Sequence, residues 1–138
     1  MDKGIEIYDI ARTARPRIRA KHLRQFDREF LRPAAAAADM SVLEVGCGTG
    51  IFLRYLQARG FRDVTGIDSD AGLAPVLDDL APFAIHLVNG ATFLAGTADG
   101  RFDRVALFDV AEHLTPGQLK GLMVENHRGT GGVAQSQL

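Results

Sequence analysis

The chain has 138 residues, of which 46% are hydrophobic and 24% are charged, and these proportions fit a single globular domain with one core. Its single cysteine, Cys47, excludes an internal disulfide framework, and no apolar run approaches the roughly 20 residues needed to span a bilayer. No apolar signal-peptide stretch follows Met1, so we expect a cytoplasmic protein without a membrane partner.

The formal net charge is −1, but the charge is uneven along the chain. Residues 1–32 hold nine Lys and Arg against five Asp and Glu, whereas the remainder holds seven against twelve. A basic segment of this kind attracts an acidic substrate or a phosphate backbone, and it equally fits the solvent-exposed face of a helix. Nucleic acid is therefore an open partner that the overall charge does not favour.

The first segment, residues 1–33, is typical of a helix. Leu23, Phe26 and Phe30 recur at the spacing of one helical face. Pro16 stands where a helix can begin and Pro33 where it ends. We therefore predict an N-terminal helix before the rest of the domain.

From residue 41 onward, short apolar segments alternate with amphipathic ones. The predicted strands are 41–45, 64–67, 84–88, 104–108 and 133–138. The predicted helices are 51–59, 72–80 and 115–126. This alternation predicts an α/β fold with a doubly wound, mainly parallel sheet and helices on both faces. Ligands in such folds bind beyond the carboxyl ends of the strands.

The turn between the first strand and the next helix carries glycines at alternate positions, Gly46, Gly48 and Gly50. A turn this tight needs backbone angles that glycine adopts easily, and a missing Cβ lets a ligand lie against bare peptide. The helix that follows offers N–H donors and a favourable dipole to a carboxylate. Asp68 ends the second strand and is placed to accept hydrogen bonds from both hydroxyls of a ribose. Together these features predict a nucleoside-containing cofactor.

The spacing of the glycines distinguishes two kinds of cofactor. It is G-x-G-x-G, whereas dinucleotide-binding turns read G-x-G-x-x-G, and Glu44 precedes the first glycine by two residues. A carboxylate there repels a pyrophosphate and attracts the ammonium group of a bound amino acid. These features argue against an NAD-dependent oxidoreductase domain, which stays an alternative from a different class of enzyme.

Three motifs occur in order along the chain: EVGCGTG at 44–50, GID at 66–68 and FDRVALFDVAEHL at 102–114. Together they resemble the first, second and fourth-strand motifs of class I S-adenosylmethionine-dependent methyltransferases, over about residues 40–138. The resemblance implies a Rossmann-like fold, S-adenosyl-L-methionine as the cofactor and S-adenosyl-L-homocysteine as its product. It also implies that residues 1–33 form a cap on the substrate side of a cofactor-binding domain at 34–138.

The resemblance implies roles for the matching residues. Glu44 would orient the methionine end of the cofactor, Asp68 would bind the ribose, and Asp109 would lie near the methyl-transfer position. Asn89 stands where many members carry an Asp that binds the adenine amino group, and its side-chain carbonyl is a substitute. The residues expected to bind the cofactor are Glu44, Gly46, Cys47, Gly48, Gly50, Asp68, Ser69, Asn89, Gly90, Ala91 and Asp109. Cys47 has no zinc partners at ligand spacing, so we expect a small turn residue there and no metal.

Methyl transfer from a sulfonium depends mainly on aligning the reacting atoms in a dry site. An oxygen or nitrogen acceptor must also lose a proton. His113 is the candidate base, with Asp109 as the second candidate catalytic residue. His113 equally fits a structural place at the start of a helix.

Members of this family usually have seven strands, and the last two form an antiparallel hairpin beside the fifth. Only six residues follow Gly132, so we expect the hairpin of the sixth and seventh strands to be missing. An uncovered sheet edge can pair with another chain, which makes a homodimer through this edge a hypothesis.

The motifs predict methyl transfer to an oxygen or nitrogen atom of a small molecule or sugar-like metabolite. Two alternatives stay open within the same fold. One is a module that binds the cofactor without turnover because the C-terminal strands are absent. The other is an RNA methyltransferase that uses the basic N-terminal helix.

Overall fold

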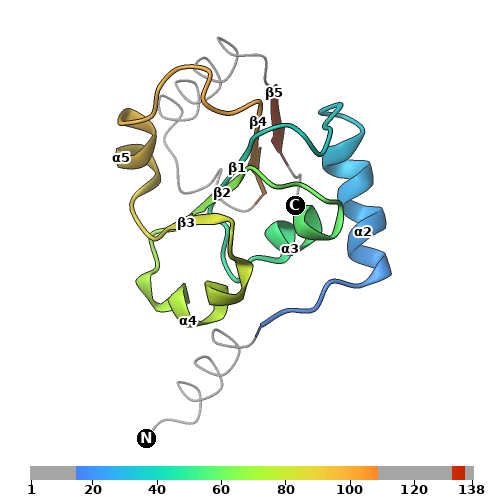
Figure 1. Ribbon diagram of the computed structural model, residues 1–138, viewed down its shortest axis with the longest axis horizontal. Coiled ribbons are helices and arrows are strands. Elements are labelled where there is room, and N and C mark those ends of the chain that lie inside the picture. Colours follow the sequence, from blue (N-terminus) through green and yellow to red (C-terminus); the bar gives the residue numbers. More distant parts are fainter. Residues whose placement is uncertain (1–14, 109–131, 136–138) are drawn as a thin grey trace, which may run out of the picture.

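The computed structural model describes residues 15–108 and the backbone of residues 132–135 (Figure 1). The strands are β1 Val42–Val45, β2 Val64–Ile67, β3 Ala84–His86, β4 Arg104–Leu107 and β5 Gly132–Gln135. The α-helices are α2 Ala20–Phe26, α3 Ile51–Ala58, α4 Ala74–Leu77 and α5 Gly90–Ala95. A π-helix, η1 Asp27–Leu31, continues α2, and the 3₁₀ turns η2 Ala71–Leu73 and η3 Asp78–Leu80 flank α4.

The five strands form one parallel sheet in the order β3-β2-β1-β4-β5. Val42, the first residue of β1, lies beside Val64 of β2 and Arg104 of β4. The chain moves outward from β1 to β3 and then returns to β4, so the strand order reverses beside β1. The predicted doubly wound α/β sheet is confirmed, and the loop after β1 lies at this reversal, where ligands of such sheets bind.

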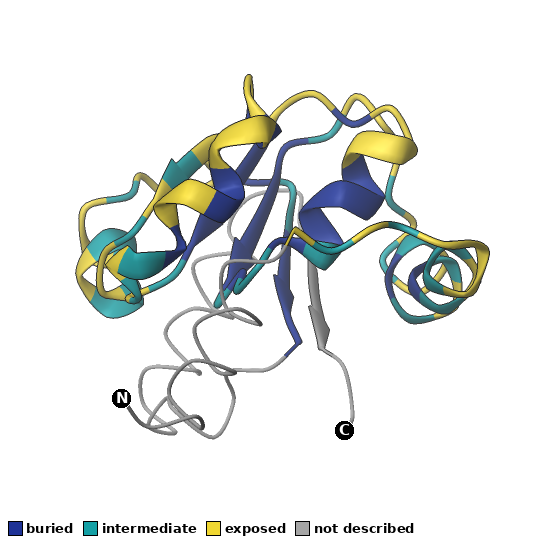
Figure 2. Ribbon diagram, turned by 90° about the horizontal axis from the view of Figure 1, so that it is seen from below, coloured by how far each residue is buried: buried dark blue, intermediate teal, exposed yellow. Residues whose placement is uncertain are grey.

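Helices cover both faces of the sheet (Figure 2). On one face, α2, α3 and α4 pack over a core that includes Val42 and Phe52. On the other face, Phe93 and Leu94 of α5 pack against a second cluster that includes Leu43. Because both faces are covered, the residues of β1 are all buried, which explains its nearly continuous apolar sequence.

The apolar face predicted for the N-terminal helix is confirmed. Phe26 is 5.2 Å from both Phe52 and Phe108, measured between ring centroids, and Phe30 is 4.9 Å from Phe52. Leu23 packs against the same cluster. The α-helix begins at Ala20 because the backbone before it is still extended, and residues 1–14 lie outside the described part of the chain.

One hydrogen-bonded cluster attaches this N-terminal segment to α3. The hydroxyl of Tyr55 donates to Oδ1 of Asp27 at 2.6 Å, and the guanidinium of Arg59 donates to the same carboxylate. These donors, Tyr55 first, hold the pKa of Asp27 below its ordinary value. Burial, aided by the Asp27 carboxylate, raises the pKa of Tyr55. The phenol therefore stays protonated and keeps donating.

The single helix predicted over 72–80 is wrong, because the segment is divided into η2, α4 and η3. Pro75 has no N–H to donate to a carbonyl of the preceding turn, so α4 can begin only just before it. The Asp70 side chain accepts from Gly72 N at 2.9 Å and starts a separate 3₁₀ turn at Ala71. The predicted segment therefore forms three short turns.

The helix α5 has no counterpart among the predicted elements. It is only six residues long and contains Gly90 and Thr92, which are poor helix formers. Its start is nevertheless marked by Asn89, whose side chain accepts from Thr92 N at 3.1 Å as an N-cap. The predicted third strand, 84–88, ends instead at His86, because β2 offers no partner beyond Ile67.

Several predictions fall where the structure gives no description. The helix predicted over 115–126 lies outside the described residues, and so do Asp109, His113 and the last part of the strand predicted over 133–138. None of the helices in the described ranges is long and apolar enough to cross a membrane.

The cluster at Asp27 predicts a specific pH dependence. The folded-state pKa of Asp27 lies below the ordinary 3.8, so its ionised form stabilises the fold above about pH 4 and that stability is lost as the pH falls through the lowered pKa. We expect Asp27→Asn to lower the free energy of unfolding by about 1 kcal/mol near neutral pH. The deficit should shrink as the pH approaches about 3, measured by urea unfolding at each pH.

Asp63→Asn is the matched control. Asp63 is more than half exposed, and its ion pair with Arg101 spans 3.4 Å, so its loss should change stability by less than about 0.5 kcal/mol. A deficit in Asp27→Asn that stays constant with pH would contradict the role assigned to the Asp27 carboxylate.

Candidate functional site

Hydrogen bonds attach the loop that follows β1 to the end of β2. The N–H groups of Gly46 and Cys47 both donate to the carbonyl of Ile67, at 2.8 and 3.0 Å. Gly50 N donates to Cys47 O at 3.0 Å and closes the turn just before α3. The φ angles of Gly46, Gly48 and Gly50 are 78°, 54° and 88°, in the left-handed region that favours glycine, as the alternating pattern predicts.

Two of these glycines meet different surroundings. No atom of the described residues would lie within 4 Å of a Cβ placed on Gly48, so among these residues its backbone borders open space. A Cβ on Gly50 would lie 2.9 Å from Leu77 Cδ2 and 3.0 Å from Leu80 Cδ1. Bare peptide open to a ligand is therefore found at Gly48, whereas Gly50 lets α4 and η3 pack closely against the start of α3.

Asp68 connects the end of β2 to the middle of this loop. Its Oδ2 accepts from Gly48 N at 2.9 Å, and its Oδ1 accepts from Asp70 N at 2.9 Å. An ionised carboxylate has about four acceptor sites, so each oxygen of this half-buried side chain can accept one further hydrogen bond. Binding of a ribose by Asp68 stays a prediction that fits this geometry.

Glu44 lies deeper, with only 4% of its surface exposed. In the sheet it lies between Gly66 of β2 and Ala106 of β4, the small residues that share its register. A Cβ on Gly66 would lie 2.8 Å from Leu53 Cδ1 and 3.3 Å from Cys47 Sγ. The role of Gly66 was missed from the sequence, although an isolated glycine inside a strand is a recognised signal of close approach.

Cys47 is buried in the loop, with 5% of its surface exposed. Burial raises the pKa of its thiol, and the nearby negative charges of Glu44 and Asp68 raise it further. A thiol that stays protonated is a poor nucleophile. This environment fits the small turn residue predicted at this position.

The segment before α5 completes the site. Gly90 lies close to the last residues of two strands, because a Cβ there would be 3.4 Å from Val45 Cγ1 and 3.6 Å from Ile67 Cδ1. Asn89, just before it, is exposed, but its carbonyl oxygen is already engaged in capping α5. The predicted contact of Asn89 with an adenine therefore has to share that oxygen, and it stays a prediction.

The structure thus brings three segments of the predicted site together at the carboxyl ends of the strands: 44–50, 68–69 and 89–91. Gly50 has no side chain to cap α3, so within the described residues the first N–H groups of that helix stay available to a ligand. Asp68 adds a negative charge nearby. Within the described residues, no group of three or more His, Cys, Asp or Glu side chains is arranged to hold a metal ion.

Comparison with known proteins connects this arrangement to one family. Residues 10–123 match the family described as "Methyltransferase domain". Rv1506c, a protein of Mycobacterium tuberculosis that carries the name of a methyltransferase, is 35% identical over 96 residues, which cover 69% of this chain and 54% of that protein.

Two solved structures share the fold. A SAM-dependent methyltransferase from Archaeoglobus fulgidus has a TM-score of 0.64 at 21% identity, and the match covers 95% of this chain and 54% of that one. A SAM-dependent methyltransferase from Thiobacillus denitrificans, crystallised with S-adenosyl-L-homocysteine, has a TM-score of 0.62 at 14% identity. This match covers 98% of this chain and 55% of that one. The chain therefore spans about half the length of these relatives.

The close packing around Gly66 predicts a measurable cost for a single methyl group. Gly66→Ala should lower the free energy of unfolding by roughly 1–3 kcal/mol, because its Cβ would press Leu53 and Cys47 away from β2. Gly96→Ala is the matched control, since the nearest atom to a Cβ there is at 3.8 Å. Chemical denaturation measures both, and equal stability of the two variants would contradict the proposed packing.

The environment of Cys47 predicts slow modification by a thiol reagent. In the folded chain a disulfide reagent such as dithionitrobenzoate should react on the order of 100-fold more slowly than in the urea-unfolded chain, because the thiol is both buried and protonated. The absorbance of the released thiolate follows the reaction. Rapid, complete labelling of the folded chain would show that the loop opens readily.

Proposed function

The chain belongs to the class I S-adenosylmethionine-dependent methyltransferase family, and we propose that the site formed by residues 44–50, 68–69 and 89–91 binds S-adenosyl-L-methionine. The sheet order and the helices on both faces are those of a Rossmann-like fold. Membership of the family indicates the type of reaction, which is methyl transfer. The geometry of this chain supports the proposed position of the cofactor.

One observation carries the proposal. Among the described residues, the backbone at Gly48 borders open space, and its N–H donates to Asp68, the residue that follows the neighbouring strand β2. A ligand lying on this bare peptide would have the remaining acceptor sites of Asp68 within reach. Ribose hydroxyls are donors of the right kind for such a carboxylate.

The ends of the cofactor can be assigned from the two sides of Gly48. Toward α3 lie the uncapped N–H groups at Gly50, which suit the carboxylate of the methionine end, and Glu44 lies buried below the loop. We propose that Ser69, the residue after Asp68, and the segment 89–91 at the start of α5 contact the adenine.

When bound, S-adenosyl-L-methionine supplies a methyl group on a sulfonium that is already a good leaving group. The chain therefore has to orient the cofactor and keep water away from the methyl group. The hydrogen bonds from Gly46, Cys47 and Gly48 to the end of β2 fix the position of the loop. We propose that this fixed loop is the main contribution of the described residues to the reaction.

The acceptor that we propose is an oxygen or nitrogen atom of a small molecule or sugar-like metabolite. Asp109, expected near the transferred methyl group, and His113, the candidate base, stay proposals for this step, as does the cap formed by residues 1–33. A homodimer through the sheet edge at β5 also stays a proposal.

Calorimetry tests the cofactor. The chain should bind S-adenosyl-L-methionine and S-adenosyl-L-homocysteine and should not bind NAD. Asp68→Ala should weaken binding by about tenfold or more, because hydrogen bonds to a charged group contribute about 1.5–3 kcal/mol.

Asp63→Ala is the matched control, because Asp63 precedes the strand that Asp68 follows and so lies at the opposite end of β2. It should leave the affinity unchanged. Binding of NAD without binding of S-adenosyl-L-methionine would overturn the proposal. A screen for methyl transfer to small acceptors would then separate turnover from binding alone.

A further inference from the structure

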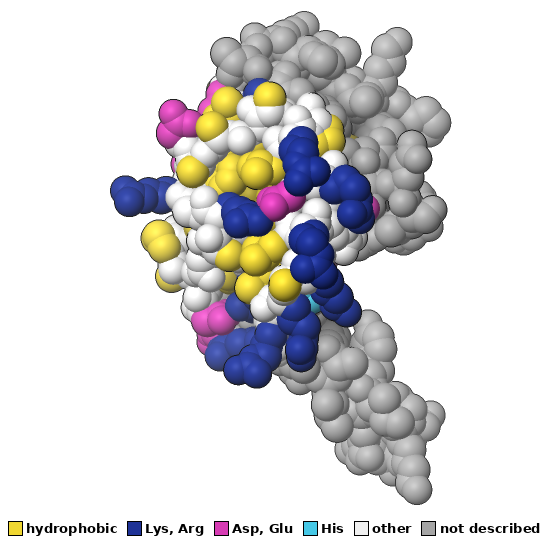
Figure 3. Space-filling model, turned by 90° about the vertical axis from the view of Figure 1, so that its right-hand side faces the viewer, with side chains coloured by type: hydrophobic (Ala, Val, Ile, Leu, Met, Phe, Trp, Pro, Cys, Tyr) yellow, Lys and Arg dark blue, Asp and Glu magenta, His cyan; other side chains and the backbone are white. Residues whose placement is uncertain are grey.

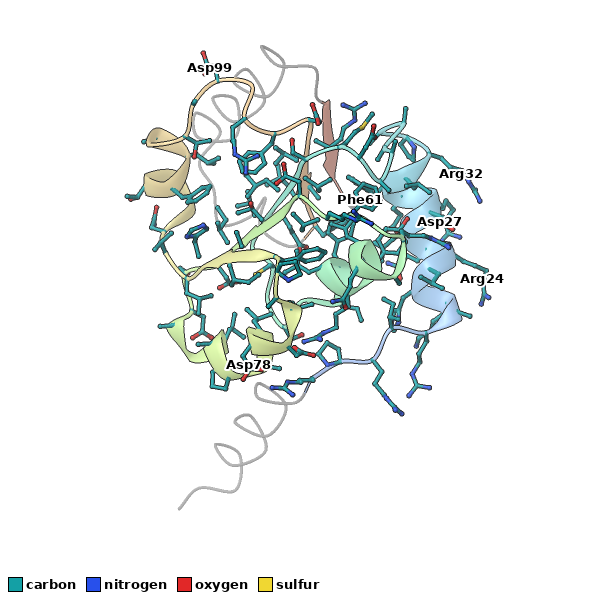
Figure 4. The ribbon with its side chains drawn as sticks, viewed as in Figure 1. Arg24, Asp27, Arg32, Phe61, Asp78 and Asp99 are labelled. Atoms are coloured by element: carbon teal, nitrogen blue, oxygen red, sulfur yellow. The ribbon has the colours of Figure 1, made fainter. Side chains whose placement is uncertain are left out.

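The outer face of α2 and η1 presents a row of cations to solvent. Lys21, Arg24, Arg28 and Arg32 follow one another at spacings of three and four residues, which puts them on one side of the helix, and Arg17 precedes them. All five are exposed. Figure 3 shows Lys and Arg side chains gathered on this side of the molecule, and Figure 4 shows Arg24 and Arg32 pointing outward from the helix. We call these five residues the basic stripe.

The basic stripe is not neutralised within the described part of the chain. The ion pairs found there involve other cations, namely Arg15, Arg54, Arg59 and Arg101. The two acidic residues of the same helical segment are engaged elsewhere. Asp27 accepts from Tyr55 and Arg59, and Glu29 accepts from Gln25 Nε2 at 3.3 Å. Among the described residues, none forms an ion pair with the stripe, and Arg32 only adds to the positive charge that lowers the pKa of Asp27.

A series of contacts links the segment that precedes the stripe to the Gly-rich loop. Arg15, two residues before the stripe, pairs with Asp78 and lies 3.7 Å from Asp79 in η3. Asp79 in turn accepts from Arg54, in the first turn of α3, at 2.7 Å. The backbone N–H of Arg54 donates to Gly50 O at 2.8 Å. These contacts connect the residue just before the stripe to the start of α3, which follows the Gly-rich loop.

We propose that the basic stripe binds the phosphate backbone of a single-stranded nucleic acid. Four of its five cations are arginine, whose planar guanidinium binds phosphate with two hydrogen bonds and stacks on bases. The cations form a single row, which matches one strand better than a broad duplex surface. This inference does not depend on the proposed cofactor, because the stripe and the Gly-rich loop are made of different residues.

A membrane surface fits the same residues less well. The apolar side of this segment, including Phe26 and Phe30, is buried against α3 and cannot insert into lipid. Among the described residues, Val88 is the exposed large hydrophobic side chain, and it lies beyond β3, at the opposite edge of the sheet from β5. The basic stripe is therefore better suited to electrostatic attraction of a flexible polyanion.

Fluorescence anisotropy tests the proposal on the whole chain. The probes are a labelled single-stranded RNA of about 20 nucleotides and a DNA of the same sequence, long enough for one site. We expect binding that weakens as salt rises, with a log–log slope of about −0.7 for each phosphate contacted. Arg28→Glu should weaken binding at least about fivefold and reduce the slope by about 0.7 or more.

Arg101→Glu is the matched control. It makes the same change of charge, but Arg101 precedes β4 and its ion pair with Asp63 lies outside the stripe. It should leave the affinity nearly unchanged. Arg24→Glu is a second variant of the stripe, and thermal unfolding of all three variants verifies that they fold.

Three results would overturn the proposal. The first is no binding of either oligonucleotide at low salt. The second is equal weakening by Arg28→Glu and Arg101→Glu, which would show attraction without a defined surface. The third is tighter, Arg28-dependent binding of polyglutamate or of vesicles rich in phosphatidylserine, which would assign the stripe to an acidic protein or a membrane. Loss of S-adenosyl-L-methionine binding with nucleic-acid binding retained would count against the proposed function alone.

Discussion

The candidate site depends on the attachment of the Gly-rich loop to the end of β2. The carbonyl of Ile67 receives the N–H groups of both Gly46 and Cys47, and the carboxylate of Asp68 receives that of Gly48. These three hydrogen bonds hold residues 46–48, which follow β1, beside residues 67 and 68 at the end of β2. Because these bonds are made within the protein itself, they fix the loop in one conformation, and this limits the ordering that binding of a cofactor would require.

The same packing that stabilises the fold shapes this surface. On one side of the sheet, α4 and η3 approach the start of α3 because Gly50 has no side chain in the way, and Leu53 and Cys47 approach β2 because Gly66 has none. On the other side, Gly90 brings the start of α5 against the ends of β1 and β2. Substitutions at these glycines therefore act on stability and on the site together.

The N-terminal segment has an apolar face that packs in the core and a basic face that is exposed to solvent. Its aromatic side chains enter the core next to Phe52, while its arginines stay in solvent. The carboxylate of Asp27 adds little negative charge to the basic face, because it accepts hydrogen bonds from Tyr55 and Arg59 on the side of α3. The result is a helix fixed firmly to the domain whose outer surface carries almost only positive charge. Such a surface can act on a polyanion without disturbing the core that holds the cofactor loop.

Much of this protein could be predicted from local sequence. Hydrophobic periodicity predicted the strands and even the bounds of β2, and the glycine pattern with Asp68 predicted which loop forms the candidate site, because strand and turn requirements act over a few neighbouring residues. Only the tertiary structure decided that, among the described residues, no side chain approaches Gly48, whereas Gly50 and Gly66 admit neighbouring side chains. Those roles depend on atoms that come close only after the chain has folded, from segments about 10 to 30 residues away, and no local pattern specifies such contacts.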